Sequence, residues 1–168
     1  GEAARRAAGA IVSAVDRVIN GKAKNAFCAV RPPGHHAESS RAMGFCLFNS
    51  AAIGAFHART KHGMERVAVI DFDVHHGNGT QHSFEQDPGL FYGSSHQFPA
   101  YPGTGSSDET GVDGNVVNAP LPPGSGSAEM TPARAGVFSA PMIELRPGSG
   151  LGRSRFGSSR SSGPEPEF

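Results

Sequence analysis

Apolar residues recur at three- and four-residue spacing over residues 2–20, which predicts an amphipathic helix. Its expected inward positions are Ala4, Ala8, Ile11, Val15 and Val18. Gly21 follows as the expected C-terminal cap. A second helix is predicted from its cap at Asn49 to about Lys61, with Gly63 ending it, and its expected inward residues are Ala52, Ala55 and Phe56.

Short apolar runs between these helices predict strands. Residues 26–30 are expected to form a buried strand that enters a loop at the Arg-Pro-Pro-Gly sequence. Residues 66–73 begin as an uninterrupted apolar strand, which is typical of a sheet covered on both faces. Further elements are expected at 80–86 (helix), 90–95 (strand) and 116–118 (strand). The alternation predicts an α/β fold with a central, mostly parallel sheet flanked by helices.

The character of the chain changes after about Met130. Residues 148–168 contain three large apolar residues among many Ser, Gly, Arg and Pro, too few to offset the entropy of ordering about 20 residues at roughly 1–2 kcal/mol each. We therefore expect a partial folded domain over residues 1–130 and a divergent, low-complexity tail, disordered or foreign to the domain, over residues 131–168.

Composition narrows the classes of function. The 168 residues carry 15 Lys and Arg against 15 Asp and Glu, with a pI near 7.3, so no direct nucleic-acid or membrane-surface binding is predicted. Cys28 and Cys46 lie in apolar runs and are expected to be buried, reduced thiols. Neither a membrane-spanning run nor a signal peptide is present, which predicts a cytoplasmic location.

The densest chemical signal lies at residues 71–79. Alternation along the strand is expected to place Asp71, Asp73 and His75 on one face at its carboxyl end, where parallel sheets hold their ligands. Two carboxylates buried together repel each other unless a cation compensates, and a carboxylate with an imidazole suits zinc. The alternative is a solvated strand end with chance acids. Gly77 and Gly79 indicate close backbone packing.

A second signal is the histidine pair that follows the Pro-Pro-Gly turn. His35 and His36 are candidate metal ligands, proton carriers or merely exposed residues. If their loop follows a strand of the same sheet, it converges on the strand end that carries Asp73 and His75. An imidazole there is a candidate general base, because its ordinary pKa near 6.5 suits proton transfer at neutral pH.

Four motifs in order carry a resemblance. Residues 31–38 (Arg-Pro-Pro-Gly-His-His-Ala-Glu), 44–49 (Gly-Phe-Cys-Leu-Phe-Asn), 71–81 (from Asp-Phe-Asp-Val-His-His-Gly-Asn) and 101–105 (Tyr-Pro-Gly-Thr-Gly) resemble those of the zinc-dependent histone deacetylase family. Asn78 and residues 96–99 are similar to its class II and bacterial branch, which includes acetylpolyamine amidohydrolases. The resemblance implies a partial arginase-like α/β fold and hydrolysis of acetyl-lysine or acetylpolyamine amides to acetate and a free amine.

The resemblance also implies roles for individual residues. Asp73 and His75 match the first two zinc ligands of the family, and His36 matches the general base and acid, with His35 assisting electrostatically. Asp71 matches the acid that orients His35, and Asn78 stands where other branches have an acid that orients His36.

Further matches concern substrate and a second cation. Phe45 and Tyr101 match the aromatic walls of the acyl-lysine tunnel, and Gly44 contributes a backbone carbonyl; ordinary core packing is the alternative for the two aromatic residues. A monovalent-cation site, holding K⁺ as a structural ion, is implied at Asp71, Asp73, His75, Ser94 and Ser95.

Two features of the family have no counterpart here. The third zinc ligand, an aspartate, and the tyrosine that stabilises the oxyanion are not matched. We therefore expect a fragment of the catalytic domain. The alternatives are an inactive truncated product, a catalytically inactive module that binds acetyl-lysine, and, more weakly, a two-manganese ureohydrolase, which needs more acidic ligands at its strand ends.

Overall fold

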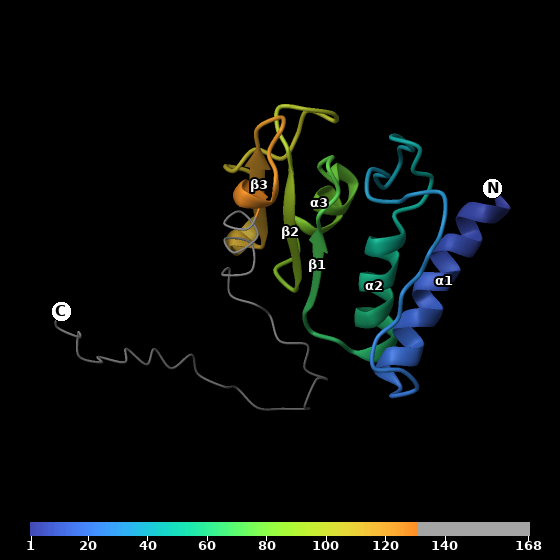
Figure 1. Ribbon diagram of the computed structural model, residues 1–168. Coiled ribbons are helices and arrows are strands. Elements are labelled where there is room, and N and C mark those ends of the chain that lie inside the picture. The colour runs from blue at the N-terminus through green and yellow to red at the C-terminus, as the bar shows by residue number, and fades with distance from the viewer. Residues whose placement is uncertain (131–168) are drawn as a thin grey trace, which may run out of the picture.

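The computed structural model describes residues 1–130, in which a sheet of parallel strands has helices beside it (Figure 1). The helices are α1 (Glu2–Ile19), α2 (Ser50–His62) and α3 (Asn78–Phe84), and a single 3-10 turn, η1, spans Val112–Gly114. The strands are β1 (Val67–Asp71), β2 (Leu90–Gln97) and β3 (Val116–Leu121). This mixed arrangement confirms the predicted α/β fold class with a parallel sheet flanked by helices.

All three strands are parallel, in the order β1-β2-β3. Val67 of β1 pairs with Leu90 of β2, and Tyr92 of β2 pairs with Val116 of β3. Among residues 1–130, the other edge of β1 has no partner strand. The carboxyl ends of the strands therefore meet at one edge of the sheet, and this edge carries Asp71.

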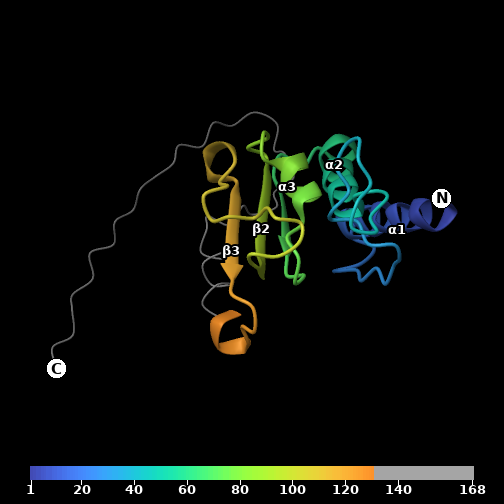
Figure 2. The same ribbon diagram turned by 90° about the horizontal axis from the view of Figure 1, so that it is seen from above.

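The two long helices lie beyond the β1 side of the sheet, with α2 between β1 and α1 (Figures 1 and 2). The helix ends follow the predicted capping residues. Asn49 accepts a hydrogen bond from the Ala52 N–H at 3.1 Å, and Gly63 and Gly21 adopt positive φ angles of 66° and 70° just beyond the helices. No helix in this described part is both long and apolar enough to cross a bilayer.

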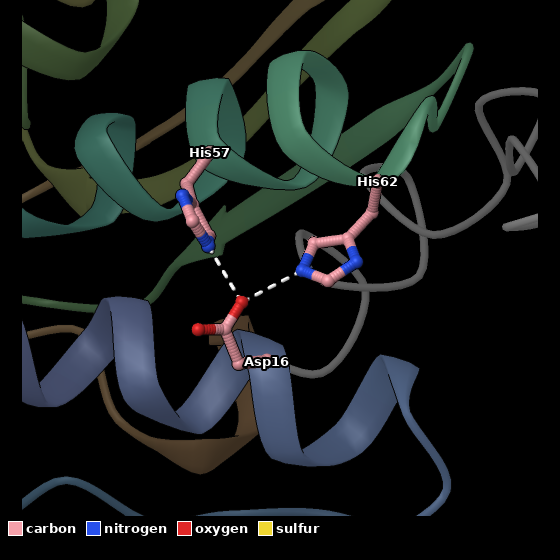
Figure 3. A group of neighbouring side chains, drawn as sticks. All are labelled: Asp16, His57 and His62. Atoms are coloured by element: carbon pink, nitrogen blue, oxygen red, sulfur yellow. Dashed lines mark hydrogen bonds and ion pairs between the residues drawn. The ribbon is translucent and has the colours of Figure 1, made fainter.

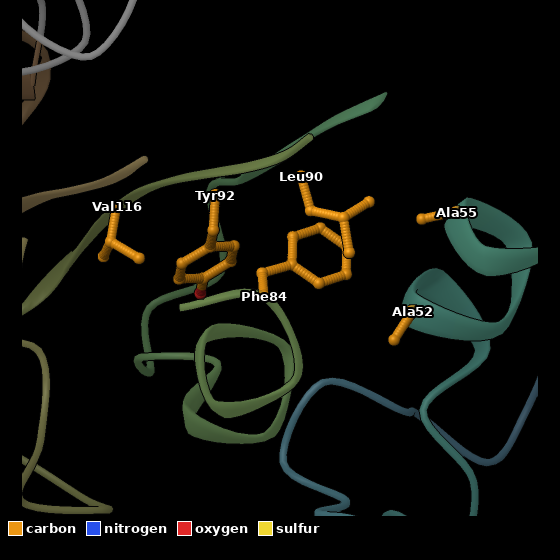
Figure 4. Packing of buried hydrophobic residues seen from close by; sticks show 6 residues of the cluster. All are labelled: Ala52, Ala55, Phe84, Leu90, Tyr92 and Val116. Carbon is orange, nitrogen blue, oxygen red and sulfur yellow. The ribbon is translucent and has the colours of Figure 1, made fainter. Parts of the chain in front are cut away.

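The core forms where α3 and α2 meet the sheet (Figure 4). Phe84 of α3 packs with Leu90 and Tyr92 of β2, and all three side chains are fully buried. Its other members are Ala52 and Ala55 of α2 and Val116 of β3, with Val67 and Val69 packed against them. Small residues on α2 allow the helix to approach the sheet, so this cluster fixes α3 and the strand ends that carry the site.

Residues 26–30 form no strand, contrary to the sequence prediction. Phe27 is 93% exposed, and the run forms no ladder with β1, although one edge of β1 has no partner strand among the described residues. The sheet is also not covered on both faces over the described residues, since Ala68 in the middle of β1 is exposed. Phe56 was expected to point inward, but it is 40% exposed, and its ring meets that of Phe84 in a T-shaped contact with the centroids 6.1 Å apart.

Candidate active site

The histidine pair lies in a loop that docks on the start of α3. The Thr80 N–H donates to the His35 carbonyl at 3.1 Å. A Cβ at Gly79 would lie 2.2 Å from the Ala37 carbonyl oxygen, so only glycine permits this contact. The loop is thereby brought to the carboxyl end of β1. His36 is buried and His35 nearly so, which rules out the reading of the pair as merely exposed residues.

His35 is held by Asp71, the final residue of β1. Its Nδ1–H donates to Asp71 Oδ2 at 2.8 Å, and the Tyr92 hydroxyl donates to the same oxygen at 3.1 Å. Burial alone lowers the pKa of His35, but the hydrogen bond to Asp71 and the charge of Asp71 outweigh burial and raise it. Burial works against the Asp71 carboxylate too, and the bond from His35 nevertheless lowers the pKa of Asp71. The pair therefore favours a protonated His35.

His36 is held by an amide instead. Asn78 Nδ2 donates to Glu38 Oε1 at 2.8 Å, so its Oδ1 faces His36 and accepts from the Nδ1–H at 2.9 Å. This arrangement puts the ring proton on Nδ1 and leaves Nε2 with a free lone pair. Burial lowers the pKa of His36, and the neutral Asn78 does not reverse the shift. The neutral form is thus favoured for His36 and the charged form for His35, and 4.1 Å separates the two ring centroids.

Asp73 and His75 lie beyond β1, not on it. The strand ends at Asp71, and two successive side-chain turns follow: Asp71 Oδ1 accepts the Asp73 N–H at 3.1 Å, and Asp73 Oδ1 accepts the His75 N–H at 2.9 Å. The predicted cause, alternation along a strand, is thus wrong. Both side chains are about half exposed, and His75 Nδ1 lies 3.5 Å from Asp73 Oδ1.

The donor types of Asp73 and His75 suit zinc, but the pair is incomplete. A catalytic zinc takes three protein ligands. Within residues 1–130, no third His, Cys, Asp or Glu joins this pair to make a three-ligand group. Among the described residues, therefore, Asp73 and His75 offer two of the three protein ligands that a catalytic zinc site takes.

Tyr101 and Gly44 enclose His36. The Tyr101 ring meets His36 edge-on at 5.1 Å and lies 6.0 Å from the His75 ring. Gly44 has a φ of 54°, and a Cβ there would lie 2.2 Å from His36 Cδ2. Phe45 has a φ of 63° and is 93% exposed, whereas Tyr101 is 47% exposed. Core packing, the alternative reading of the two aromatic residues, is therefore wrong.

Next to the site lies a buried network of polar side chains that was not predicted from the sequence. His76 binds Thr104 through Nδ1 at 2.8 Å and Gln81 through Nε2 at 2.9 Å, and Gln81 binds Glu109. Burial lowers the pKa of His76 to about 4, so the ring is neutral. Glu109 in turn accepts the Gly105 N–H at 2.9 Å. The network holds the loop that carries Tyr101; no spacing rule marks it, although His76 and Gln81 lie inside the motif at 71–81.

The residues assigned to a monovalent cation are brought together only in part. Asp71 pairs with Ser94 in the strand register, and Ser94 and Ser95 are buried. Ser94 Oγ hydrogen-bonds His96 Nδ1 at 2.9 Å. Asp73 and His75, by contrast, lie in the exposed turns beyond β1. Cys46 is buried and Cys28 partly buried, and both are free thiols.

Comparison with known proteins places these features in a family. The family model described as "Histone deacetylase domain" matches residues 1–148. Histone deacetylase 14, chloroplastic, of Arabidopsis thaliana is 47% identical over 69% of this chain and 29% of its own length. The polyamine deacetylase HDAC10 of Homo sapiens is 52% identical over 56% of this chain and 14% of its own length.

A solved structure agrees with the sequence relatives. The crystal structure of the HDA15 HD domain superposes with a TM-score of 0.68 and is 47% identical, covering 71% of this chain and 35% of that one. The chain thus spans well under half the length of each of these proteins.

Proposed function

The chain belongs to the histone deacetylase domain family, and we propose that it supplies the acid–base half of a site that hydrolyses N-acetyl amides. The substrate is an acetylated lysine side chain or an acetylpolyamine, and the products are acetate and a free amine. The observation that carries the proposal is the pair of differently held imidazoles, His35 on Asp71 and His36 on Asn78, beside Asp73, His75 and the ring of Tyr101.

His36 has the role of proton carrier. Its Nε2 lone pair takes a proton from the attacking water, and the resulting imidazolium returns a proton to the departing amine nitrogen. The Asn78 oxygen keeps the Nδ1 proton in place through both transfers. Asp71 favours the protonated form of His35, whose ring centroid lies 4.1 Å from that of His36, and in this form His35 stabilises negative charge that develops on the acetyl oxygen.

Asp73 and His75 are the residues that would hold zinc. When bound, zinc polarises the acetyl carbonyl and lowers the pKa of its water. The remaining protein ligand is proposed to come from a segment outside residues 1–130. Asp71, Ser94 and Ser95 are proposed to border a site for a monovalent cation such as K⁺, together with the turn that carries Asp73 and His75.

The test places these residues in a relative that supplies the rest of the deacetylase domain. Residues 1–130 replace the matching segment of the Arabidopsis relative, giving what we call the exchange protein, and acetate release from an acetyl-lysine peptide is measured with zinc. We expect turnover in the exchange protein and a loss of at least about 10²-fold in its His36→Ala variant, because general acid–base catalysis contributes about 10²–10⁴-fold. The control is His82→Ala, an exposed histidine on α3, with turnover unchanged.

Two results would contradict the proposal. A folded exchange protein that releases no acetate would show that these residues do not support hydrolysis. Equal turnover with and without the His36 imidazole would remove the role assigned to it. Circular dichroism of each variant confirms that the comparison is made between folded proteins.

The second candidate function is binding of an acetylated chain without hydrolysis. It is favoured for this chain taken alone because Asp73 and His75 provide only two of the three ligands that a catalytic zinc takes. Tyr101 packs on His36, and Phe45 follows Gly44, which also packs on His36; both aromatic side chains are exposed. An acetylated chain could therefore bind between these side chains even without a complete metal site. This reading predicts saturable binding of an acetyl-lysine peptide to the chain, no acetate release, and weaker binding after Tyr101→Ala. Absence of binding in a direct titration would exclude it.

A further inference from the structure

A second group of potential metal ligands lies away from the candidate active site, between the two long helices. Asp16 is in the last turns of α1, His57 is in the second half of α2, and His62 is the final residue of α2. Figure 3 shows both imidazoles pointing from α2 toward the carboxylate on α1. The side chains of His57 and His62 are 21% and 13% exposed, and that of Asp16 is 43% exposed. The group is therefore largely enclosed but open to solvent on one side.

The three ligand atoms converge on one point. Asp16 Oδ1 lies 2.7 Å from His57 Nε2 and 2.7 Å from His62 Nε2. The two rings are nearly perpendicular, with centroids 5.4 Å apart, so both Nε2 atoms face the same oxygen without stacking. All three atoms lie within 4.8 Å of one another. Such convergence of two imidazole nitrogens and one carboxylate oxygen is the geometry of a metal-binding face.

We propose that Asp16, His57 and His62 bind a divalent transition metal, zinc in the first instance, and that the ion fastens α1 to α2. Imidazole nitrogen with one carboxylate oxygen is a donor set that suits zinc. Zinc–ligand bonds of about 2.0–2.2 Å in tetrahedral geometry separate the ligand atoms by roughly 3.3 Å. Each oxygen–nitrogen separation of 2.7 Å must therefore widen by about 0.6 Å, which side-chain rotation can supply. Each imidazole binds the ion through an unprotonated Nε2 and carries its one ring proton on Nδ1, solvent mediating this exchange of the proton between the two nitrogens, and water takes the open fourth position.

The helix ends attract a cation at this point, although their last turns also carry the basic residues Arg17, Arg59 and Lys61. Both helices end beside the group, and the carbonyl ends of helices attract positive charge. The fully buried residues of α1 are Ala4 and Ala7, near its start. Its second half has no fully buried side chain, so a metal bridge from Asp16 to α2 would anchor the part of the helix that packing holds least.

The experiment separates this site from the candidate active site. Zinc is titrated calorimetrically into the full chain carrying His75→Ala, which removes a ligand of the active-site pair, and into the same chain with Asp16→Asn added. The amide oxygen of Asn still accepts both imidazole hydrogen bonds but is a poor zinc ligand, so a hydrogen-bonded link survives and a metal link does not. We expect one equivalent of zinc to bind before the change, and at least tenfold weaker binding after it.

A thermal readout and a matched control complete the test. Zinc should raise the Tm of the chain when Asp16 is present and leave it unchanged in Asp16→Asn, whereas His82→Ala should behave like the parent chain in both measurements. Equal zinc affinity with and without Asp16, or an equal loss with His82→Ala, overturns the proposal.

Nitrogen-15 NMR of the histidine rings in the unsubstituted chain gives an answer even if a variant fails to fold. The Nε2 signals of both His57 and His62 should move as zinc is added. Unmoved signals at saturating zinc would show that these imidazoles are not ligands.

Discussion

The adjacent histidines His35 and His36 have pKa values that shift in opposite directions, because their hydrogen-bond partners differ. His35 faces the carboxylate of Asp71 and has a raised pKa, whereas His36 faces the amide of Asn78 and has a lowered one. Two neighbouring titratable groups driven apart in this way can divide the work of charge stabilisation and proton transfer between them. The difference between the two histidines depends on one acceptor atom each, Asp71 Oδ2 for His35 and Asn78 Oδ1 for His36.

Exchanging that amide for a carboxylate should move the pH dependence of catalysis. In the exchange protein, Asn78→Asp combined with Glu38→Gln keeps a hydrogen-bonded pair at 78 and 38 but places a negative charge beside His36. A carboxylate favours the protonated imidazole and raises its pKa, so the rising limb of the rate profile should shift to higher pH. Profiles of acetate release from pH 5 to 9 measure it, and an unshifted limb would contradict the account.

Gly44 should be indispensable for the placement of His36. Gly44→Ala puts a methyl group 2.2 Å from His36 Cδ2, at a backbone φ of 54° that disfavours side chains. Displacement of a catalytic ring by about 1 Å costs about 10²-fold in rate, and we expect a loss of this order in acetate release. Gly9→Ala is the matched control, because its Cβ meets nothing within 4 Å. Equal rates for the two variants would show that the contact is not needed.

Much of the site was predictable at this scale because four motifs fix which residue types stand near one another. His35, His36, Asp71 and Asn78 form the pairings that the resemblance implied. Tyr92 was missed because its position in an apolar strand looks like core, and its ring is indeed buried while its hydroxyl reaches Asp71. A tyrosine can pack its ring in the core and place its hydroxyl in a polar site at the same time, so an apolar strand pattern does not reveal the polar role.

At the scale of elements, local chemistry determined the helices better than the strands. Asn49 and Gly63 terminate α2 through contacts within a few residues, which a sequence displays directly. An apolar run, by contrast, becomes a strand only beside a partner edge. Residues 26–30 and β1 are both apolar, yet β1 alone pairs within the described chain, and the difference lies in tertiary neighbours.

The loop between β2 and β3 depends on one carboxylate. Glu109 accepts N–H groups of Gly105 and Ser106 and a bond from Gln81. Burial raises the pKa of Glu109, but these bonds outweigh it and lower the pKa below the ordinary value of 4.5. A carboxyl group whose folded pKa is lowered stabilises the fold above its unfolded pKa, and this stability disappears as pH falls through the folded value.

Glu109→Gln should therefore flatten the acid dependence of stability. At pH 7 we expect the free energy of unfolding to fall by about 1 kcal/mol, since charged hydrogen bonds become neutral ones. Between pH 5 and pH 3 the parent chain should lose more stability than the variant. Urea unfolding at each pH measures both quantities, and parallel curves for the two proteins would refute the role of Glu109.

For the whole molecule, the free edge of β1 is the main structural consequence of the described architecture. A groove of about 650 Å³ runs along it, lined among others by Ile11, Pro33, His35, Val69 and Asp73. Phe27, near this edge, is 93% exposed, and Phe72, the residue that follows β1 in the chain, is 71% exposed. Unpaired strand edges with apolar neighbours promote association between chains.

A charge on that edge should reduce association. Ala68 is exposed in the centre of β1, and Ala68→Lys introduces a charged side chain there without filling the core. We expect the apparent mass of the chain in light scattering to rise with concentration, and to rise less in the variant. Lys61→Ala, an exposed change on α2, should behave like the parent chain. Identical concentration dependence in all three proteins would show that this edge does not mediate association.

The central claim is that this chain preassembles a neutral proton carrier at His36, and nitrogen-15 NMR of the histidine rings in the purified chain tests it most directly. The account predicts a His36 ring with a protonated Nδ1 and an unprotonated Nε2 at pH 7, and loss of that tautomer preference in Asn78→Ala. A His36 ring protonated on Nε2, or doubly protonated at that pH, would contradict it.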